Sequence, residues 1–546
     1  MNHIVRNRLL SLFLCFFLAI SLTGCGAESD NEGQLSMSYL NSPPTVDPQL
    51  CSEVFCLRTV SLYMSTLYTY DETGKLVPGL AESYDVSTDG LTYTFHLKKG
   101  LKWSDGTPLT AHDFVFAFRR LADPGTGSGS VYLITDSCKV KHVEEVQSGK
   151  KRVDELGVSA PDENSFVVEL EQPCPYFLSV LTSYVFSPCN EAFFKKCNGE
   201  YATSPETMLA CGPYIMDQYE PLAVQIHFVP NPNYYDFGKN KKLPSEINIQ
   251  VVSNPQQALM CFDTGQFNVV SVNGELLVKL ADDPHLIALP AARLQFIQFG
   301  NLSQSAGKNV HIRRALGRSI DRDAIVNDYF QTGAYSLQRI SPRGYYQETD
   351  GSDYSGDDKQ YKDVTGYDPA AAKKEWEQGL QELGTKTVEM KLAFSSTEQN
   401  LCEILKQQME KNLPGLSIKM LSLPAKEWLS ALNKSQSDMI YEGWSADYAD
   451  PTAFYDFWIT GSRGDQGYSD PKVDQMLNEC GSQEIASDPE KRNKLLHKIE
   501  DRLLENMAMI PLFSQENCFM VSGDYSKFNL NSTATGYLIS SLERQE

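Results

Sequence analysis

The sequence lacks several short motifs by which common catalytic sites are recognised. It contains no Cys-x-x-Cys pair, no His-Glu-x-x-His, no Gly-x-Ser-x-Gly and no Gly-x-x-x-x-Gly-Lys-Ser/Thr, and its eight histidines form no local cluster. The commonest signatures of zinc sites, serine hydrolases and P-loop enzymes are therefore missing. We expect no enzyme, no cofactor and no metal ligand, although an enzyme stays open because catalytic groups need not be close in sequence.

Positive charge is also scarce. Forty-eight Lys and Arg face 70 Asp and Glu, a net charge of −22, and removal of residues 1–24 with Arg6 and Arg8 leaves 46 against 70, or −24. A chain this acidic repels nucleic acid and anionic lipid. We expect no nucleic-acid partner, and membrane attachment through acyl chains rather than through a basic patch.

The one long apolar run, residues 9–22, is shorter than the roughly 20 residues that a spanning helix needs. It follows Arg6 and Arg8, as in an export signal. Residues 22–25, "LTGC", resemble the lipobox of bacterial lipoproteins, in which Cys25 becomes the lipidated first residue. We predict a signal peptide at 1–24 and a lipidated Cys with a flexible tether at 25–36.

Thirteen cysteines minus Cys15 and Cys25 leave eleven, an odd number that excludes a complete disulfide framework. Two pairs are close enough in sequence to be bridged, Cys51 with Cys56 and Cys189 with Cys197. An exported location permits these bridges without requiring them, and small buried thiols are an equal alternative.

At 546 residues the chain exceeds one ordinary core, so we expect at least two lobes. Residues 91–97 alternate as a half-buried strand, and Thr110 with Asp113 begins a helix as a capping box. The later half is more regular: strand 387–394, a helix carrying Leu401 and Leu405, strand 416–423, a short helix from Pro424 and strand 438–444. This order implies a parallel sheet.

Two further helices are predicted to begin at Pro369 and Pro489, each with a core-facing apolar stripe.

The segment "DMIYEGWSADYADP" (438–451) ends its strand where ligands bind in open α/β sheets, beyond the carboxyl ends of the strands. Asp447, beside Trp444 and Tyr448, is a candidate to meet a cationic group flanked by aromatic surface. The alternative is that Asp447 and Asp450 are loop and cap residues, positions that Asp favours for its own backbone hydrogen bonds.

Several stretches together resemble the extracytoplasmic solute-binding proteins of peptide ABC transporters, family 5, of the oligopeptide-binding type. They are "PPTVDPQL" (43–50), "VPGLAESYDVSTDGLTYTFHLKKGLKWSDGTPLTAHDFVFAFRRLADP" (77–124), "CGPYIM" (211–216), "NPNYYD" (231–236), "FDTGQFN" (262–268), "VHIRRALGRSIDRDAIV" (310–326), "YDPAAAKKEW" (367–376) and "IPLF" (510–513). They occur in the family's order over nearly the whole mature chain.

The resemblance implies an α/β, two-lobed fold of the periplasmic-binding-protein kind (type II, large peptide-binding class), with a hinge between the lobes. The implied lobe I core comprises residues 37–66, 208–298 and 513–546, with an inserted subdomain at 67–207. Lobe II spans 299–512. Such a monomer captures an oligopeptide outside the cytoplasm and delivers it to an ABC permease and its ATPase.

The stretch 444–451 fits the pattern W-x-A-D-Y-x-(E/D)-P of the oligopeptide binders. By that match Asp447 would hold the peptide's α-ammonium, with Trp444 and Tyr448 beside it, while the peptide backbone adds a strand near Gly443 and Ser445. Two more residues that the match places at the ligand are Trp428, for which core packing is an equal alternative, and Glu53, from the first lobe.

Relatives that prefer very short peptides carry Arg where this chain has Leu432 and Tyr441, so we expect longer peptides; Lys434 lies nearby. The alternatives are the same fold with another cargo (a dipeptide, nickel chelate, heme, sugar or signalling peptide), or a sensory or adhesion lipoprotein without transport.

Overall fold

The computed structural model describes residues 33–222, 224–238, 243–300, 302, 304–356, 358–424, 427–428, 437–461, 468–530 and 536–545. The predicted signal peptide, Cys25 and most of its tether lie outside these residues, as do Leu432, Lys434 and most of the helix expected from Pro424. Among the described helices, none is long and apolar enough to cross a membrane.

A six-stranded sheet holds the strand that carries the candidate site. Its order is β14-β18-β13-β17-β15-β16. The strands are β13 (Arg293–Phe299), β14 (Ala334–Ser336), β15 (Val388–Ser395), β16 (Leu416–Leu423), β17 (Met439–Ser445) and β18 (Met509–Gln515). The parallel sheet predicted from three of them is confirmed, because β15 pairs in parallel with both β16 and β17. The other three strands are antiparallel, so the complete sheet is mixed.

A seven-stranded sheet contains the first strand and strands from the middle and the end of the chain. Its order is β12-β19-β11-β1-β10-β9-β8. The strands are β1 (Gln34–Tyr39), β8 (Tyr214–Gln218), β9 (Gln225–Pro230), β10 (Glu246–Val251), β11 (Val269–Ser271), β12 (Leu286–Leu289) and β19 (Asn517–Val521). Strands from near both ends of the described chain, β1 and β19, therefore lie in one sheet, on either side of β11.

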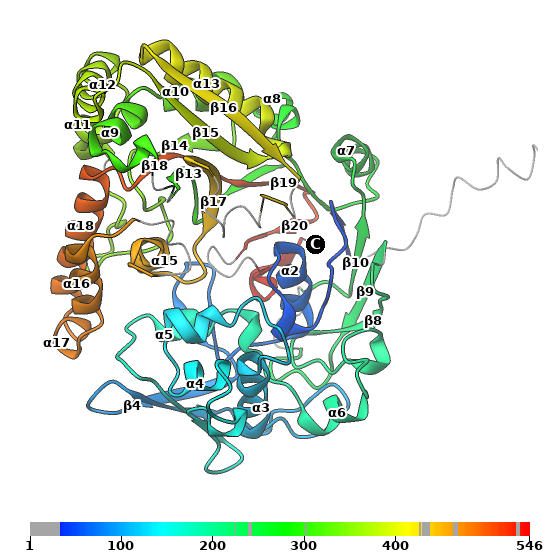
Figure 1. The fold of residues 1–546 in the computed structure, drawn as a ribbon. Coiled ribbons are helices and arrows are strands. Elements are labelled where there is room, and N and C mark those ends of the chain that lie inside the picture. The colour runs from blue at the N-terminus through cyan, green and yellow to red at the C-terminus, as the bar shows by residue number, and fades with distance from the viewer. Residues whose placement is uncertain are drawn as a thin grey trace, which may run out of the picture.

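Between β1 and β8, the chain forms a third, four-stranded sheet of order β4-β5-β7-β6. Its strands are β4 (Ala81–Val86), β5 (Thr92–Leu97), β6 (Val158–Ser159) and β7 (Ser165–Glu169). Two further sheets have two strands each: β2 (Tyr68–Tyr70) pairs with β3 (Leu76–Pro78), and β20 (Tyr525–Ser526) pairs with β21 (Glu543–Arg544) near the end of the chain. In Figure 1 the four-stranded sheet lies at the bottom, and β17 runs from the six-stranded sheet towards it.

The described helices are α2 (Val54–Tyr63), α3 (Ala111–Ala122), α4 (Val143–Gln147), α5 (Phe177–Val180), α6 (Glu191–Lys196), α7 (Pro255–Asp263), α8 (Glu275–Leu280), α9 (Val310–Arg318), α10 (Arg322–Ala324), α11 (Lys362–Thr365), α12 (Pro369–Leu383), α13 (Gln399–Asn412), α15 (Thr452–Tyr455), α16 (Pro471–Cys480), α17 (Gln483–Ala486) and α18 (Pro489–Glu505).

Three helix starts predicted from sequence are confirmed, those of α3, α12 and α18. Thr110 and Asp113 form the expected capping box of α3, and Asp368 and Asp488 accept backbone N–H groups at the starts of α12 and α18. Each cap satisfies donors that the first turn leaves without a helical partner. These local signals therefore set the boundaries that position the later sheet.

The division into lobes stays a prediction. Its proposed boundaries at 298/299 and 512/513 fall within β13 and β18, two adjacent strands of the six-stranded sheet. A hinge at these boundaries would pass through two paired strands, so that both crossings would bend together. Below, residues 67–207 are called the inserted segment and residues 299–512 the second segment.

Only one of the two candidate disulfides forms. Cys51 and Cys56 are bonded, with their Cα atoms 5.7 Å apart. Cys189 and Cys197 are free thiols, and the Cys189 thiol is instead a hydrogen-bond acceptor for the Arg120 guanidinium at 3.6 Å. Burial raises the pKa of the Cys189 thiol to about 12, so it stays protonated at neutral pH.

Candidate functional site

Asp447 lies directly beyond the carboxyl end of β17, as predicted. Its side chain is half-buried, and its Oδ2 accepts a hydrogen bond of 2.7 Å from the hydroxyl of Tyr132. Tyr132 belongs to the inserted segment, 315 residues earlier in the chain. The carboxylate therefore sits where the inserted and second segments meet.

Trp444 forms an aromatic wall beside Asp447. Its ring centroid lies 6.4 Å from that of Tyr132 and 4.5 Å from that of Phe457, and its Nε1 donates to the carbonyl of Ala453 at 3.0 Å. The indole donor is thus engaged by α15, which fixes the ring plane. An anionic group flanked by aromatic faces is a suitable receptor for an ammonium ion.

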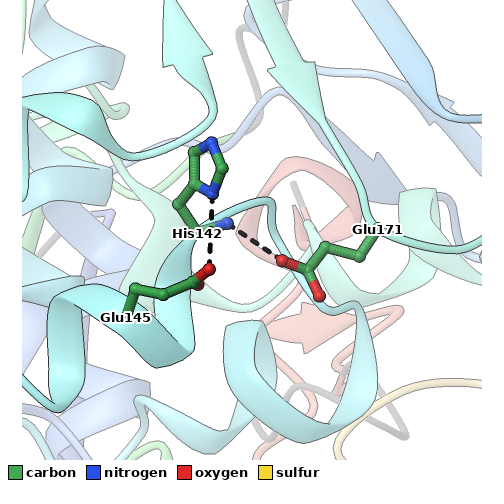
Figure 2. Close-up of side chains that lie close together, drawn as sticks. All are labelled: His142, Glu145 and Glu171. Carbon is green, nitrogen blue, oxygen red and sulfur yellow. Dashed lines mark hydrogen bonds and ion pairs between the residues drawn. The ribbon is translucent and has the colours of Figure 1, made fainter. Parts of the chain in front are cut away.

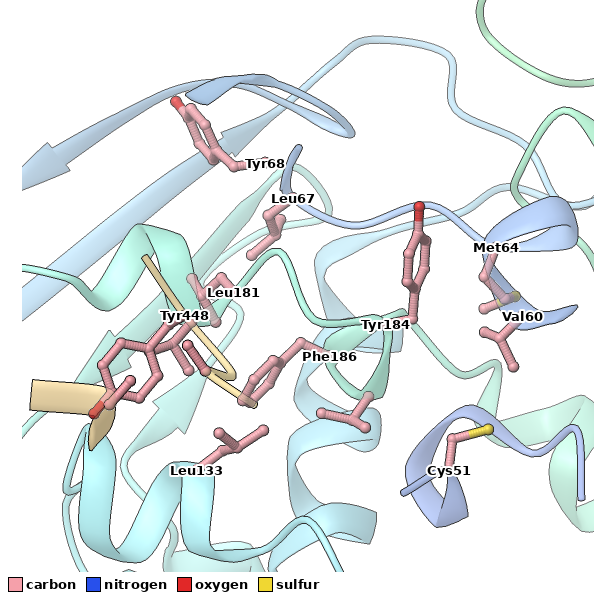
Figure 3. Close-up of a cluster of buried hydrophobic side chains, with 14 of the residues drawn as sticks. Cys51, Val60, Met64, Leu67, Tyr68, Leu133, Leu181, Tyr184, Phe186 and Tyr448 are labelled. Atoms are coloured by element: carbon pink, nitrogen blue, oxygen red, sulfur yellow. The ribbon is translucent and has the colours of Figure 1, made fainter. Parts of the chain in front are cut away.

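Tyr448 points into the protein and fastens the two segments together. Its ring stacks on Tyr176 of the inserted segment with centroids 4.6 Å apart and planes 5° from parallel. It belongs to the same buried cluster as Leu133 and Leu181 (Figure 3). Beside it, the Ala449 amide donates to Ser179 Oγ at 2.7 Å. At 2% exposure, Tyr448 positions Asp447 through packing.

Asp450 forms a buried ion pair, a structural role that the sequence did not distinguish from the role of Asp447. Its two oxygens accept from both terminal nitrogens of Arg492, at 2.6 and 2.9 Å, and Oδ1 also accepts from the Thr452 amide at 3.0 Å. Both charged side chains are at most 4% exposed. Asp450 is thus a loop residue that accepts the amide two residues later, and a bidentate pair with Arg492 balances its charge.

Behind the Tyr176–Tyr448 stack lies a cavity of about 240 Å³ between the inserted and second segments. Its polar lining includes Asp136, Gln172, Thr452 and Asp456. Burial raises the pKa of Asp456 to about 7; the carboxylates of Asp450 and Asp136 add to the rise, and the Tyr448 hydroxyl and Arg492 oppose it. The contact between the segments thus contains a carboxyl group that titrates near neutrality.

Asp456→Asn should change how stability depends on pH. The pKa near 7 exceeds the value of about 3.9 for an unfolded Asp, so the native state binds more protons between those limits. This carboxyl's contribution is full below about pH 4 and is lost as pH rises through 7, up to about 4 kcal/mol. The melting temperature of Asp456→Asn minus that of the wild type should therefore be larger at pH 8 than at pH 5.

The matched control is Asp282→Asn, at an exposed carboxylate, which should give the same difference at both pH values. Equal differences for Asp456→Asn at pH 5 and pH 8 would contradict a raised pKa.

At the end of β17, one edge of the strand is paired with β13, and the other edge extends beyond the ladder that joins β17 to β15. Residues 439–445 pair with β13 along their full length, with Gly443 opposite Gln295 and Ser445 opposite Arg293. On the other side the register with β15 covers only Met439 and Ile440. A Cβ at position 443 would lie 2.5 Å from Gln295 Oε1, so any larger residue there would require the Gln295 side-chain amide to move.

The two remaining predicted site residues, Trp428 and Glu53, lie on other elements, whereas Tyr441, where short-peptide binders carry Arg, lies on β17 itself. Trp428 is half-buried, its backbone amide donates to the Pro424 carbonyl at 2.8 Å, and its buried Nε1 has no hydrogen-bond partner among the residues that the structure describes. Glu53 is exposed at the start of α2, within the loop that the Cys51–Cys56 bridge closes. Tyr441 is 4% exposed within the core of the second segment.

Sequence reasoning missed Tyr132, Tyr176 and Ser179, the residues through which the inserted segment meets the end of β17. They follow no motif, and an isolated Tyr or Ser carries no signal of a partner about 270 to 315 residues away in the sequence. A loop contact explains how Tyr132 is placed: Ser128 Oγ and Ser130 Oγ donate to the carbonyls of Gln49 and Cys51.

Comparisons with known proteins agree with this architecture. Residues 75–466 match the model of the bacterial extracellular solute-binding proteins, family 5 Middle. The chain is 28% identical to the dipeptide-binding protein of Lactococcus lactis subsp. cremoris, covering 95% of this chain and 96% of that one. It is 26% identical to the oligopeptide-binding protein OppA of Bacillus subtilis, covering 93% and 94%.

The structure of Listeria monocytogenes OppA bound to peptide superposes with a TM-score of 0.77 at 26% identity, covering 95% of this chain and all of that one. The expected α/β fold class is therefore confirmed along the chain. The family consists of non-enzymatic binding proteins, in agreement with the missing catalytic motifs. With a family model that spans most of its length, the chain belongs to the bacterial extracellular solute-binding proteins of family 5.

Proposed function

We propose that this protein captures oligopeptides outside the cytoplasm and delivers them to an ABC permease and its ATPase for uptake. The observation that carries the proposal is the carboxylate of Asp447, half-buried at the junction of two segments, beside Trp444 and in hydrogen-bond contact with Tyr132. An ammonium ion enclosed there would interact with Asp447 far more strongly than in water.

The rest of the peptide would be held through its backbone. The ladder between β15 and β17 ends at Ile440, so the following residues, with Gly443 and Ser445 among them, are candidates to pair with an added strand. Main-chain hydrogen bonds give affinity without fixing side-chain identity. Support for a peptide as cargo comes from the relatives that bind dipeptides and oligopeptides.

The remaining parts of the proposal follow the family. Cys25 would carry the lipid that anchors the monomer to the bacterial membrane, and Trp428 and Glu53 would contact the ligand. Tyr441 is buried in the core, which supports a preference for longer peptides whose C-terminus is not read by a cation at that position. Another cargo in the same fold, or a sensory role, remains the second candidate.

Calorimetric titration of residues 26–546 with one mixed-sequence pentapeptide, free and N-acetylated, tests the proposal. The free peptide should bind, and the acetylated peptide should lose most of its affinity because it has no ammonium for Asp447 to meet. Equal binding of both forms would remove Asp447 from the ligand site. Binding of neither form would reject oligopeptides of this length as the cargo.

A further inference from the structure

A histidine and two glutamates converge in the inserted segment, away from the end of β17. His142 immediately precedes α4, Glu145 lies on α4 three residues later, and Glu171 follows the end of β7. One ring nitrogen and one oxygen of each carboxylate all lie within 4.8 Å of one another. Figure 2 shows the two carboxylates approaching His142 from different elements.

The backbone holds these three residues in place. The Glu171 amide donates to the Lys139 carbonyl at 2.8 Å, Val140 and Leu170 form a bridge, and the His142 amide donates to Glu171 Oε1 at 3.1 Å. His142 itself has φ of 68°, in the left-handed region, at the residue where α4 begins. The cluster is therefore built by main-chain contacts between two segments.

The imidazole nitrogen that faces the carboxylates lacks a hydrogen bond. Nδ1 of His142 is a buried atom with no hydrogen-bond partner among the described residues, and it lies 3.7 Å from Glu145 Oε1. That distance is too long for a hydrogen bond. It is close to the separation of about 3.3 Å between two ligand atoms that share one tetrahedral zinc ion. Two carboxylates beside one such nitrogen form an electronegative pocket.

The donor set selects a class of cation. One imidazole nitrogen and two carboxylate oxygens suit Zn²⁺, which takes four ligands at about 2.0 to 2.2 Å. Ca²⁺ and Mg²⁺ prefer six or more oxygen ligands and do not favour imidazole. We propose that His142, Glu145 and Glu171 form a binding site for a divalent transition-metal ion, best filled by Zn²⁺ with water as the fourth ligand.

The site would tie α4 to the chain that follows β7. The neighbouring residues Glu144 and Gln172 line the cavity between the inserted and second segments, so a bound ion would stiffen one wall of that cavity. Zinc binding at this site would not depend on which solute the protein carries.

Calorimetric titration of the chelator-treated mature protein with ZnCl2 tests the site. Three variants should each weaken zinc binding by about tenfold or more: His142→Asn, Glu145→Gln and Glu171→Gln. Asn is chosen at 142 because it tolerates the left-handed backbone. The matched controls Glu144→Gln, on the same helix, and His285→Asn, at an exposed His–Asp pair, should leave zinc affinity unchanged.

X-ray absorption at the zinc edge provides a second readout that does not depend on the variants folding equally well. It should report nitrogen and oxygen ligands only. Three results would each overturn the site: no zinc binding by the wild type, equal zinc affinity in the wild type and the three variants, or sulfur ligands from the free cysteines. MgCl2 and CaCl2 should bind at least tenfold more weakly at the same residues, and comparable affinity would overturn its assignment to a transition metal.

Discussion

Asp447→Asn should weaken the binding of a free pentapeptide by about 3 kcal/mol, or roughly a hundredfold in Kd, under the proposed function. The substitution removes the negative charge that would face the ammonium ion, while its amide oxygen still accepts from the Tyr132 hydroxyl. Because Asp447 is only half-buried, the melting temperature should change little. Calorimetry with the free and the N-acetylated peptide measures the effect.

Tyr132→Phe supplies a graded control, since it removes the hydroxyl that donates to Asp447 but keeps the carboxylate and the ring that faces Trp444. Its loss of affinity should be smaller, about tenfold, in line with the net value of one charge-assisted hydrogen bond. If Asp447→Asn bound the free peptide as tightly as the wild type, the carboxylate would have no role in the ligand site.

Asp450→Asn, three residues later, should have the opposite effect: a large loss of stability and a small change in peptide affinity. It leaves Arg492 buried with no balancing carboxylate, a change that costs about 3 to 5 kcal/mol of stability. Arg492 also lies 5.6 Å from the centre of the Tyr176 ring, so the loss reaches the contact between the segments. Urea unfolding should show a lower midpoint, and peptide affinity measured well below that midpoint should change far less than in Asp447→Asn.

The double variant Asp450→Asn/Arg492→Met tests the cause. Removing both charges leaves no unpaired ion, so it should recover part of the stability lost in the single variant. If the double variant lost more free energy of unfolding than the two single variants lose together, the pair would not act through its charges.

Elements with strong local signals could be predicted from the sequence. Alternation placed β5, β15, β16 and β17 within a residue or two of their observed bounds, and Asp-Pro pairs placed the starts of α12 and α18. These signals are short-range, because burial on one face and satisfaction of the first helical donors both act within a few residues. No such short-range signal predicted that β13, β14 and β18 join this sheet as antiparallel strands, since their pairing partners are far away in sequence.

The sequence by itself determined the family, a strand over 438–444 and the position of Asp447 just beyond it. It did not separate the roles of Asp447 and Asp450, which have the same chemistry three residues apart. Only the tertiary structure decided that Arg492 balances one carboxylate and that Tyr132 contacts the other. The reason is physical: an aspartate's function depends on which distant charge or hydroxyl the fold brings within about 3 Å, and no local pattern encodes that neighbour.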